Sequence, residues 1–559
     1  MLLNKIQNKF PFVVIFFSLW GVLIYSNTFH ASFHLDDYLT IVNNEYVHWD
    51  DLSVNNIKKL FSKETTDDDR IMYGRPLSYL TFGLNYYLGA LDVWGYHVFN
   101  MTIHIITGSL LYIFLYQTLK LPAMNGQYEE RAGWIAFISS ILWFSSPVQI
   151  EAVTYIVQRM TSMSSMFYVL SLIFFVRWRT SNSSFNWIYP ILMGLSFLIS
   201  IGSKPIAITL PIVMVLYEIC FFQRGKWGGL ARSKFVFLVL IIIAMLLFTV
   251  VDFQQYLPYG KFSIKERIYT EARVIIYYMT LLLFPLPERM SLHYDYPLSR
   301  TLFDPETTII SLSVLSFIFI FAVLNTRKRP LQAFLLLWFL LAVSAGSAAV
   351  RTELIFEHRL YLPSMAFFPF AVITGVSVFG EKNDFVRKIL VGTVILVVAA
   401  YSVNTYMRNS QWVDGYSIHS DSVRKYPENL QARLSLGSYY LNNERYDDAI
   451  THLKKAVELH PRRGEARLFL GMAYYRNKLY AKAIKELEFS LTMVDFDKLP
   501  YEVFTALGNS YIIEGRLNDA EGAFKEALRL APNKLLYGQI SDIISGIIKK
   551  NHEVEDNGK

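Results

Sequence analysis

Long stretches without an ionisable side chain dominate the first 400 residues. Ten of them contain no Asp, Glu, Lys or Arg, and an eleventh, 205–222, is interrupted only by Glu218. A helix rises about 1.5 Å per residue and the hydrocarbon core is roughly 30 Å thick, so about 20 apolar residues span a bilayer. The ten uninterrupted stretches are 10–35, 93–119, 132–150, 160–176, 180–203, 235–251, 307–326, 330–350, 360–380 and 389–407. They predict an all-α, polytopic bundle of about eleven spans. The 14 uncharged residues 274–287 predict a re-entrant or interfacial helix.

The charged residues divide the chain into two parts. From Arg408 onward 43 of 152 residues are charged, against 56 of the 407 before it. An ordinary soluble domain has about 25% charged residues. This split excludes a single soluble globule and a disordered polymer. A disulfide-stapled secreted module is also excluded, because the lone Cys220 has no partner cysteine in the chain. The split predicts a membrane domain over 1–407 followed by a soluble C-terminal part.

The distribution of Lys and Arg predicts the orientation. With the N-terminus inside, the predicted inner segments hold 16 bases in about 54 residues. The predicted outer loops before Arg408 hold 15 in about 144 residues. Basic loops stay cytoplasmic, so the long loops 27–92 and 252–306 and the C-terminal part are expected outside. A cleaved signal peptide is the less favoured alternative for the first segment.

The C-terminal part contains three repeats. Leu-Gly-x-x-Tyr recurs with Gly437, Gly471 and Gly508, at intervals of 34 and 37 residues, and each Gly is followed twelve positions later by Ala. This is the tetratricopeptide (TPR) pattern. It predicts a linker and partial capping repeat over 408–429, three repeats over 430–534, and a C-terminal helix and charged tail over 535–559. The repeats serve equally well as a structural spacer or as a groove for a partner protein.

Two adjacent carboxylates, Asp36 and Asp37, follow the first apolar stretch. One could act as a general base that its neighbour orients, or they could be a helix cap and a solvated neighbour. Spacing alone favours the cap.

Further ionisable residues share a placement at the predicted outer ends of helices. A purely structural explanation for the Lys and Arg residues is that their side chains snorkel to the membrane interface. Grouped on one side, however, bases can hold a phosphate and carboxylates can take a proton. These residues are Arg75, His97, Glu151, Arg159, Lys204, Glu357 and Arg359. No spacing of His or carboxylates indicates a metal site; no cofactor is expected to be required, although paired acids could hold a divalent cation. No nucleic-acid signature is present.

Several motifs together resemble one known family. They are Asp36-Asp37, "GRPLSYLTFGLNYYLG" (74–89), "GYHVFN" (95–100), "SPVQIEAVTYIVQR" (146–159), "SKP" (203–205) and "EHRLYLP" (357–363), with TPR repeats after the last span. In this order they are similar to the transmembrane and TPR repeat-containing O-mannosyltransferases and their bacterial relatives, within the GT-C superfamily. Animal members often have an acidic residue where this chain has Pro205. The resemblance implies chemistry at the periplasmic face of a bacterial inner membrane.

The resemblance implies inverting transfer of a mannose-like sugar from a polyprenyl-phosphate donor to a hydroxyl of an exported protein. Asp36 would be the general base, and Asp37 would orient it or hold the acceptor. The donor phosphate would lie against Arg359 and Arg159, with Lys204 and Arg75 as further candidates. His97, Glu151 and Glu357 would contact substrate, and the TPR groove could receive the acceptor protein.

Other function classes stay open at this point. A non-catalytic membrane scaffold could use its TPR domain to recruit partners, and a GT-C enzyme could act on a lipid or glycan acceptor. A transporter is less favoured, because only Glu218 lies near the middle of a predicted span. An enzyme needs an outer cavity that joins Asp36 to Arg359 and opens to lipid, whereas a scaffold needs none.

Overall fold

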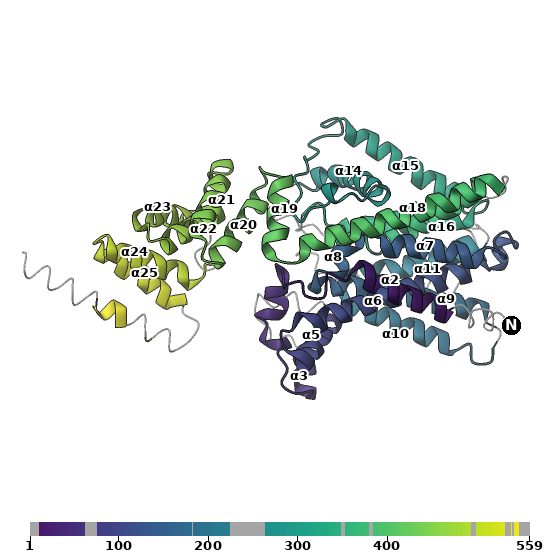
Figure 1. Cartoon of the computed structure of the whole chain (residues 1–559), viewed down its shortest axis with the longest axis horizontal. Helices are drawn as coiled ribbons and strands as arrows, with labels where there is room; N and C mark the ends of the chain where they lie inside the picture. Colours follow the sequence, from purple (N-terminus) through teal and green to yellow (C-terminus); the bar gives the residue numbers. More distant parts are fainter. Residues whose placement is uncertain are drawn as a thin grey trace, which may run out of the picture. The chain divides into compact units, whose positions relative to one another are not determined.

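The computed structural model describes residues 10–61, 75–181, 183–223, 263–347, 353–379, 384–493, 499–530, 538 and 542–546. Within these ranges every regular element is a helix (Figure 1). The chain divides into two compact units: Met1–Met290 with Tyr296–Asp414, and Ser291–Asp295 with Gly415–Lys559.

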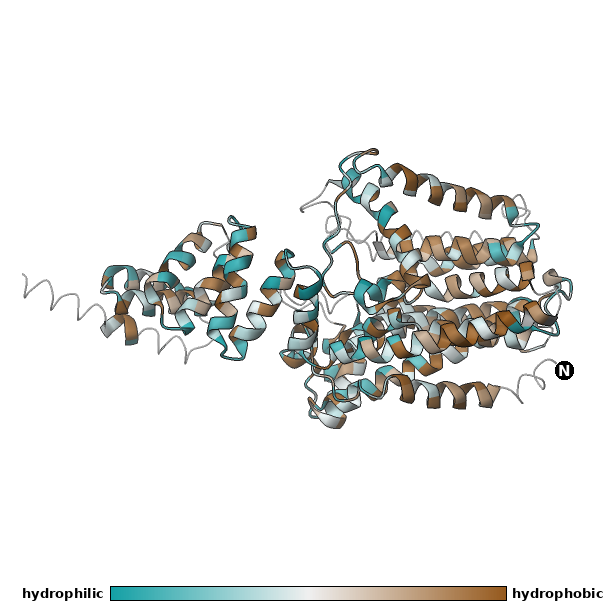
Figure 2. Cartoon of the chain, turned by 45° about the horizontal axis from the view of Figure 1, so that its top comes forward, coloured by the Kyte–Doolittle hydropathy of each residue, from teal (hydrophilic) through white to brown (hydrophobic). Residues whose placement is uncertain are grey.

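The first unit contains the helices that are long and apolar enough to span a membrane. Among the residues that the structure describes, five stretches pass by length and composition: α6 (Val93–Leu119), Ile156–Thr180 with α9 (Arg159–Thr180), Pro205–Phe222 with α11 (Leu210–Tyr217), α15 (Thr307–Asn325), and Lys388–Trp412 with most of α18 (Asp384–Asn409). The chain is therefore an integral membrane protein. Figure 2 shows apolar residues running along the long helices of this unit.

Shorter apolar helices complete the bundle. They are α2 (Phe10–Ile24), α10 (Ile188–Ser203), α16 (Pro330–Ser347) and α17 (Ser364–Phe379). The predicted span at 235–251 lies outside the described residues, so the count of eleven stays a prediction. The stretch 274–287 falls mostly in α14 (Ile264–Leu283), whose first half carries five charged residues. The helices pack in the order α10, α9, α6, α7, α17, α16, α15 and α14.

One predicted span, 132–150, is broken. Its first part, α7 (Ala132–Ser145), meets the segment Pro147–Val153, which includes α8 (Ile150–Val153), at an angle of 58°. Pro147 has no N–H to continue the helix of α7. Irregular backbone of this kind is tolerated at membrane depth where protein surrounds it, and residues 146–157 are buried. The break places the short segment 147–153, which contains Gln149 and Glu151, inside the bundle.

The first outer loop is attached to the end of α18. Asn27 donates to the carbonyl of Tyr406 at 3.0 Å, and the Ser32 N–H donates to the carbonyl of Val413 at 2.9 Å. The loop continues through α3 (Val54–Lys59), and α5 (Pro76–Gly89) follows. Gly83 allows α5 to approach this loop, because a Cβ there would lie 2.6 Å from the Trp49 ring.

The second unit is built from paired helices. After α19 (Gly415–Lys425), the pairs are α20 (Leu430–Asn442) with α21 (Tyr446–Leu459), α22 (Gly464–Arg476) with α23 (Tyr480–Leu491), and α24 (Tyr501–Ile513) with α25 (Leu517–Leu530). The three repeat glycines lie where the helices of each pair meet. A Cβ at Gly437 or Gly471 would lie 2.6 Å from a Leu side chain of the partner helix. Close packing therefore requires a residue without a side chain.

Candidate active site

Asp37 is completely buried where the first outer loop meets the segment before α9. Its carboxylate accepts hydrogen bonds from the backbone N–H of His34, at 2.9 Å, and of Val157, at 2.7 Å. Burial raises the pKa of Asp37 to about 8, although these two N–H donors oppose the rise. Asp37 therefore holds two distant segments together, and its carboxylate is enclosed by protein.

Asp36, in contrast, is exposed. Its backbone N–H donates to the hydroxyl of Tyr155 at 2.9 Å, and the same hydroxyl hydrogen-bonds its carboxyl. Surrounding protein atoms desolvate the carboxyl and raise its pKa, while Arg75, Tyr155 and Lys204 lower it. The preceding Leu35 has a φ of 42°, in the left-handed region that bulky residues rarely adopt. Such strain is concentrated at functional sites, and here it lies directly before Asp36.

Lys204 lies at the centre of the charged residues. It is in extended backbone between α10 and Pro205, and its Nζ donates to Gln158 Oε1 at 3.0 Å and to Thr161 Oγ1 at 2.5 Å. Burial lowers its pKa well below the ordinary value. The charges of Arg75 and Arg359 lower it further, whereas those of Glu151 and Asp36 raise it. Lys204 therefore interacts electrostatically with four residues. We call Lys204 and these four residues the charged cluster; the four are Asp36, Arg75, Glu151 and Arg359.

The two arginines of the charged cluster are held by different segments. Arg75 precedes α5, and its Nη1 lies 3.2 Å from the sulfur of Met160. Arg359 donates to the carbonyls of Leu354, at 3.0 Å, and Glu353, at 2.9 Å. These contacts orient both guanidinium groups.

Glu151 and His358 form a buried pair beside the charged cluster. The backbone N–H of His358 lies 2.8 Å from Glu151 Oε2, and its Nδ1 lies 2.8 Å from Oε1. Burial lowers the pKa of His358 well below its usual value, and Lys204, Arg359 and Arg75 lower it further. The neutral ring then donates its Nδ1–H to the carboxylate, which leaves Nε2 as an acceptor. His358 was not predicted as a site residue, although it stands between two ionisable residues in the sequence.

Glu357 has a structural partner. Its Oε1 lies 3.5 Å from Nη2 of Arg408, and both side chains are buried. This ion pair joins the 357–360 turn to the end of α18. Arg408 was predicted only as the start of the C-terminal part, because a lone basic residue after a span gives no indication of its partner.

Arg159 hydrogen-bonds residues that do not belong to the charged cluster. It is fully buried and donates to Asn100 Oδ1 at 2.6 Å, to the carbonyl of Thr81 at 3.2 Å and to the carbonyl of Tyr96 at 3.1 Å. Its guanidinium also stacks 4.4 Å from the ring of Phe99. These donors fasten α9 to α5 and α6, and the expected role of Arg159 in binding the donor phosphate stays a prediction.

His97 is likewise buried by packing. Its Nε2 lies 2.9 Å from the carbonyl of Ala31, and its exposed fraction is 1%. The contact fixes the start of α6 against the first outer loop. In this structure His97 positions the loop that carries Asp36, and its expected contact with substrate stays a prediction. Among the described residues, no three His, Cys, Asp or Glu side chains gather as a metal site.

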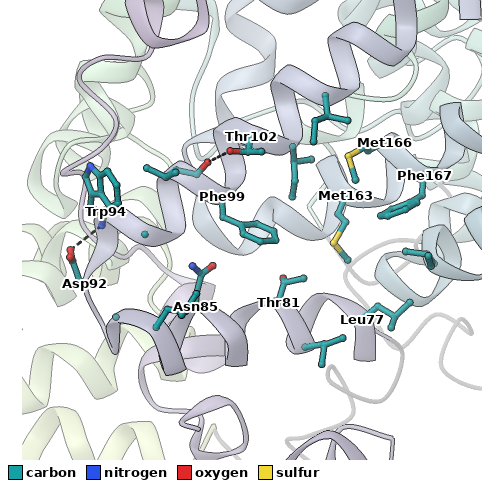
Figure 3. Close-up of a pocket in the computed structure, with 18 residues that line it drawn as sticks. Leu77, Thr81, Asn85, Asp92, Trp94, Phe99, Thr102, Met163, Met166 and Phe167 are labelled. Atoms are coloured by element: carbon teal, nitrogen blue, oxygen red, sulfur yellow. Dashed lines mark hydrogen bonds between the residues drawn. The ribbon is translucent and has the colours of Figure 1, made fainter. Parts of the chain in front are cut away.

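A cavity of about 800 Å³ lies between α5, α6 and α9 (Figure 3). Phe99 of α6 and Met163 of α9 point toward α5, which carries Leu77, Thr81 and Asn85. Neither Asp36 nor Arg359 lines it. The cavity is thus a neighbour of the charged cluster and not the space that joins its members.

Known families and proteins are similar to both the membrane part and the repeat part of the chain. The tetratricopeptide repeat family matches residues 434–488 and 501–534. A Caenorhabditis elegans protein named "Protein O-mannosyl-transferase F38B6.6" is 26% identical over 440 residues, covering 75% of this chain and 58% of the relative. Human "Protein O-mannosyl-transferase TMTC3" is 25% identical over 455 residues, covering 74% and 47%. Xenopus laevis "Protein O-mannosyl-transferase tmtc2" is 28% identical over 221 residues, covering 38% and 25%.

The chain spans about half the length, or less, of the curated relatives it matches. The comparisons confirm the resemblance to a TPR-containing O-mannosyltransferase family. They also confirm an all-α chain with apolar membrane helices and C-terminal TPR repeats, a module that mediates contacts between proteins.

Proposed function

We propose that this chain is a membrane glycosyltransferase that moves a mannose-like sugar from a polyprenyl-phosphate donor to a hydroxyl of an exported protein. One observation carries the proposal: the exposed carboxylate of Asp36 interacts electrostatically with Arg75 and Lys204. A proton acceptor and phosphate-binding cations are the two chemical functions that this transfer requires. The names of the relatives supply the sugar and the class of acceptor.

The reaction is a single displacement with inversion. The acceptor oxygen attacks C1 of the sugar, Asp36 takes the hydroxyl proton, and the bond between C1 and the phosphate oxygen breaks. The polyprenyl phosphate leaves with the electron pair of that bond. A positioned general base contributes roughly 10²–10⁴-fold to the rate. Asp37 supports this step as a positioning residue, because its hydrogen bonds fix the loop that carries Asp36.

The cations of the charged cluster stabilise the leaving phosphate. Arg75 and Arg359 are the cations of the charged cluster, and Lys204, whose pKa burial lowers, adds an amino group beside the carboxyls of Asp36 and Glu151. Negative charge grows on the phosphate as the glycosidic bond breaks, so preorganised cations stabilise the transition state more than the ground state. Neutral His358 adds no further positive charge and keeps Glu151 in place.

The location and the acceptor complete the proposal. The basic loops predict that the charged cluster faces the periplasm, with the N-terminus in the cytoplasm and the TPR repeats on the same side as the cluster. The concave surface of the repeats would then receive the acceptor protein.

The test replaces Asp36 by Asn in the full chain, purified and reconstituted into vesicles with a radiolabelled mannosyl polyprenyl phosphate and an acceptor protein. We expect the rate of transfer to fall at least about 10²-fold. Asp50→Asn is the matched control, because Asp50 is an exposed acid of the same loop. An unchanged rate for Asp36→Asn would reject the base. A wild-type chain that transfers no sugar but still binds protein through its repeats would favour the scaffold.

A further inference from the structure

The cavity between α5, α6 and α9 is lined mainly by apolar side chains. Leu77 and Leu80 come from α5, Val98 and Phe99 from α6, and Met163 and Phe167 from α9. Its volume of about 800 Å³ is within the range of small-molecule sites. Figure 3 shows the Phe99 ring and the Met163 thioether facing the same open space. A space of this kind suits a flexible hydrocarbon.

One rim of the cavity faces the surroundings of the membrane domain. Leu88, Trp94 and Ile106 belong to its lining, with exposed fractions of 79%, 51% and 43%. On a membrane-spanning helix such as α6, exposed apolar side chains contact lipid chains, and Trp is typical of the interface. The cavity is therefore accessible from the bilayer.

Its other end lies beside the charged cluster. Leu77 lines the cavity two residues after Arg75, and Met163 lies one turn after Met160, whose sulfur contacts Arg75 at 3.2 Å. The Ser78 hydroxyl donates to the carbonyl of Ser203 at 3.1 Å, immediately before Lys204. An apolar space beside two basic residues complements an amphiphile with an anionic head and a long apolar chain.

We propose that this cavity binds the first isoprene units of the polyprenyl-phosphate donor while Arg75 and Lys204 hold its phosphate. This inference rests on the proposed function and deepens it. The remaining isoprene units of the donor extend past Ile106 into the bilayer, because the cavity is open on that side. The buried apolar length of the donor, and not only its phosphate, then contributes to affinity.

The test is photocrosslinking, which requires no turnover. The full chain is placed in nanodiscs of phosphatidylethanolamine and phosphatidylglycerol and irradiated with a polyprenyl phosphate that carries a diazirine on its first isoprene units. We expect mass spectrometry to find the label on peptides of α5, α6 and α9, and unlabelled polyprenyl phosphate to displace it. A label that maps elsewhere overturns the inference. Equal displacement by added phosphatidylglycerol also overturns it, because the site would then hold ordinary acyl chains.

Two variants fill the cavity. Val98 and Thr102 both line the cavity, so Val98→Trp places a larger side chain at a half-buried position and Thr102→Trp places one at an exposed position. We expect each to lower crosslinking at least about tenfold. Val314→Trp is the matched control, because Val314 is an exposed apolar residue on α15, away from the cavity lining. Unchanged labelling in both cavity variants contradicts the inference.

Sugar transfer measured in parallel separates the two proposals. Labelling of α5, α6 and α9 without any transfer rejects the proposed function and supports the binding site. Transfer that depends on the donor, with labelling elsewhere, supports the function and rejects this site.

Discussion

Glu151 and His358 are joined at two points, with the carboxylate accepting from both the backbone N–H and the ring Nδ1 at 2.8 Å. The two residues are 207 positions apart in the chain. Glu151 belongs to the segment after the break at Pro147, and His358 belongs to the turn that carries Arg359. The pair therefore links the segments that present Tyr155 and Arg359 to the charged cluster.

Removing either partner of this pair should destabilise the protein. We expect Glu151→Gln and His358→Ala each to lower the free energy of unfolding by about 1.5–3 kcal/mol, the range for a hydrogen bond to a charged group. The double variant should cost less than the two single changes added together, because both remove one interaction. Denaturant unfolding of the four proteins in detergent micelles measures this coupling. Additive losses would show that the pair contributes no joint stability.

Arg75 should control the acidic limb of the pH–rate profile. Among the charges near Asp36, Arg75 lowers its pKa most. Arg75→Gln removes this charge, so the pKa of Asp36 rises and the acidic limb of kcat/KM moves to higher pH. The rate above the limb should fall about 10²-fold, because one phosphate-binding cation is lost. Arg75→Lys keeps the charge and should leave the limb near its wild-type position.

An acidic limb that stays in place in Arg75→Gln would exclude Asp36 as the titrating base. Measuring the profile with a fixed, saturating acceptor separates this result from a change in acceptor binding.

The sequence predicts the elements well where the signal is local. Among the described residues, most of each charge-free stretch corresponds to helix, and the spacing of Gly437, Gly471 and Gly508 predicts the paired helices, because each signal lies within about 40 residues. The break at Pro147 is different. Residues 132–150 carry no charge and are long enough for a continuous span, but Pro147 has no N–H to continue the helix, and the structure shows that the segment after it is buried.

The candidate site was harder to predict, because placement at a helix end does not specify which way a side chain points. Lys204 and Arg159 have equivalent positions in the sequence. The structure places Lys204 among Asp36, Arg75 and Arg359, whereas Arg159 is enclosed by α5 and α6. Tyr155 was missed because its contact with Asp36 spans 119 residues.

Asp37 should make stability depend on pH in a defined direction. Its pKa is raised to about 8 from about 3.9 in the unfolded chain, so the folded state binds more protons between these values. The contribution is fully present below about pH 3.9 and is lost as the pH rises toward 8, with a slope of up to about 1.4 kcal/mol per pH unit. Asp37→Asn should lack this slope, which unfolding measured from pH 5 to 9 would show. Parallel curves for the two proteins would contradict the raised pKa.

Arg159 should be required for folding and not for affinity toward the donor. Lysine retains the charge but cannot supply the guanidinium donors that reach Asn100, Thr81 and Tyr96. We expect Arg159→Lys to lower the free energy of unfolding by at least about 2 kcal/mol, because buried acceptors lose their partners. The KM for the donor should stay unchanged in the protein that folds. Arg177→Lys, near the other end of α9 and partly exposed, is the matched control and should change stability by less than about 0.5 kcal/mol. A raised donor KM with unchanged stability would support the phosphate role that the sequence suggested.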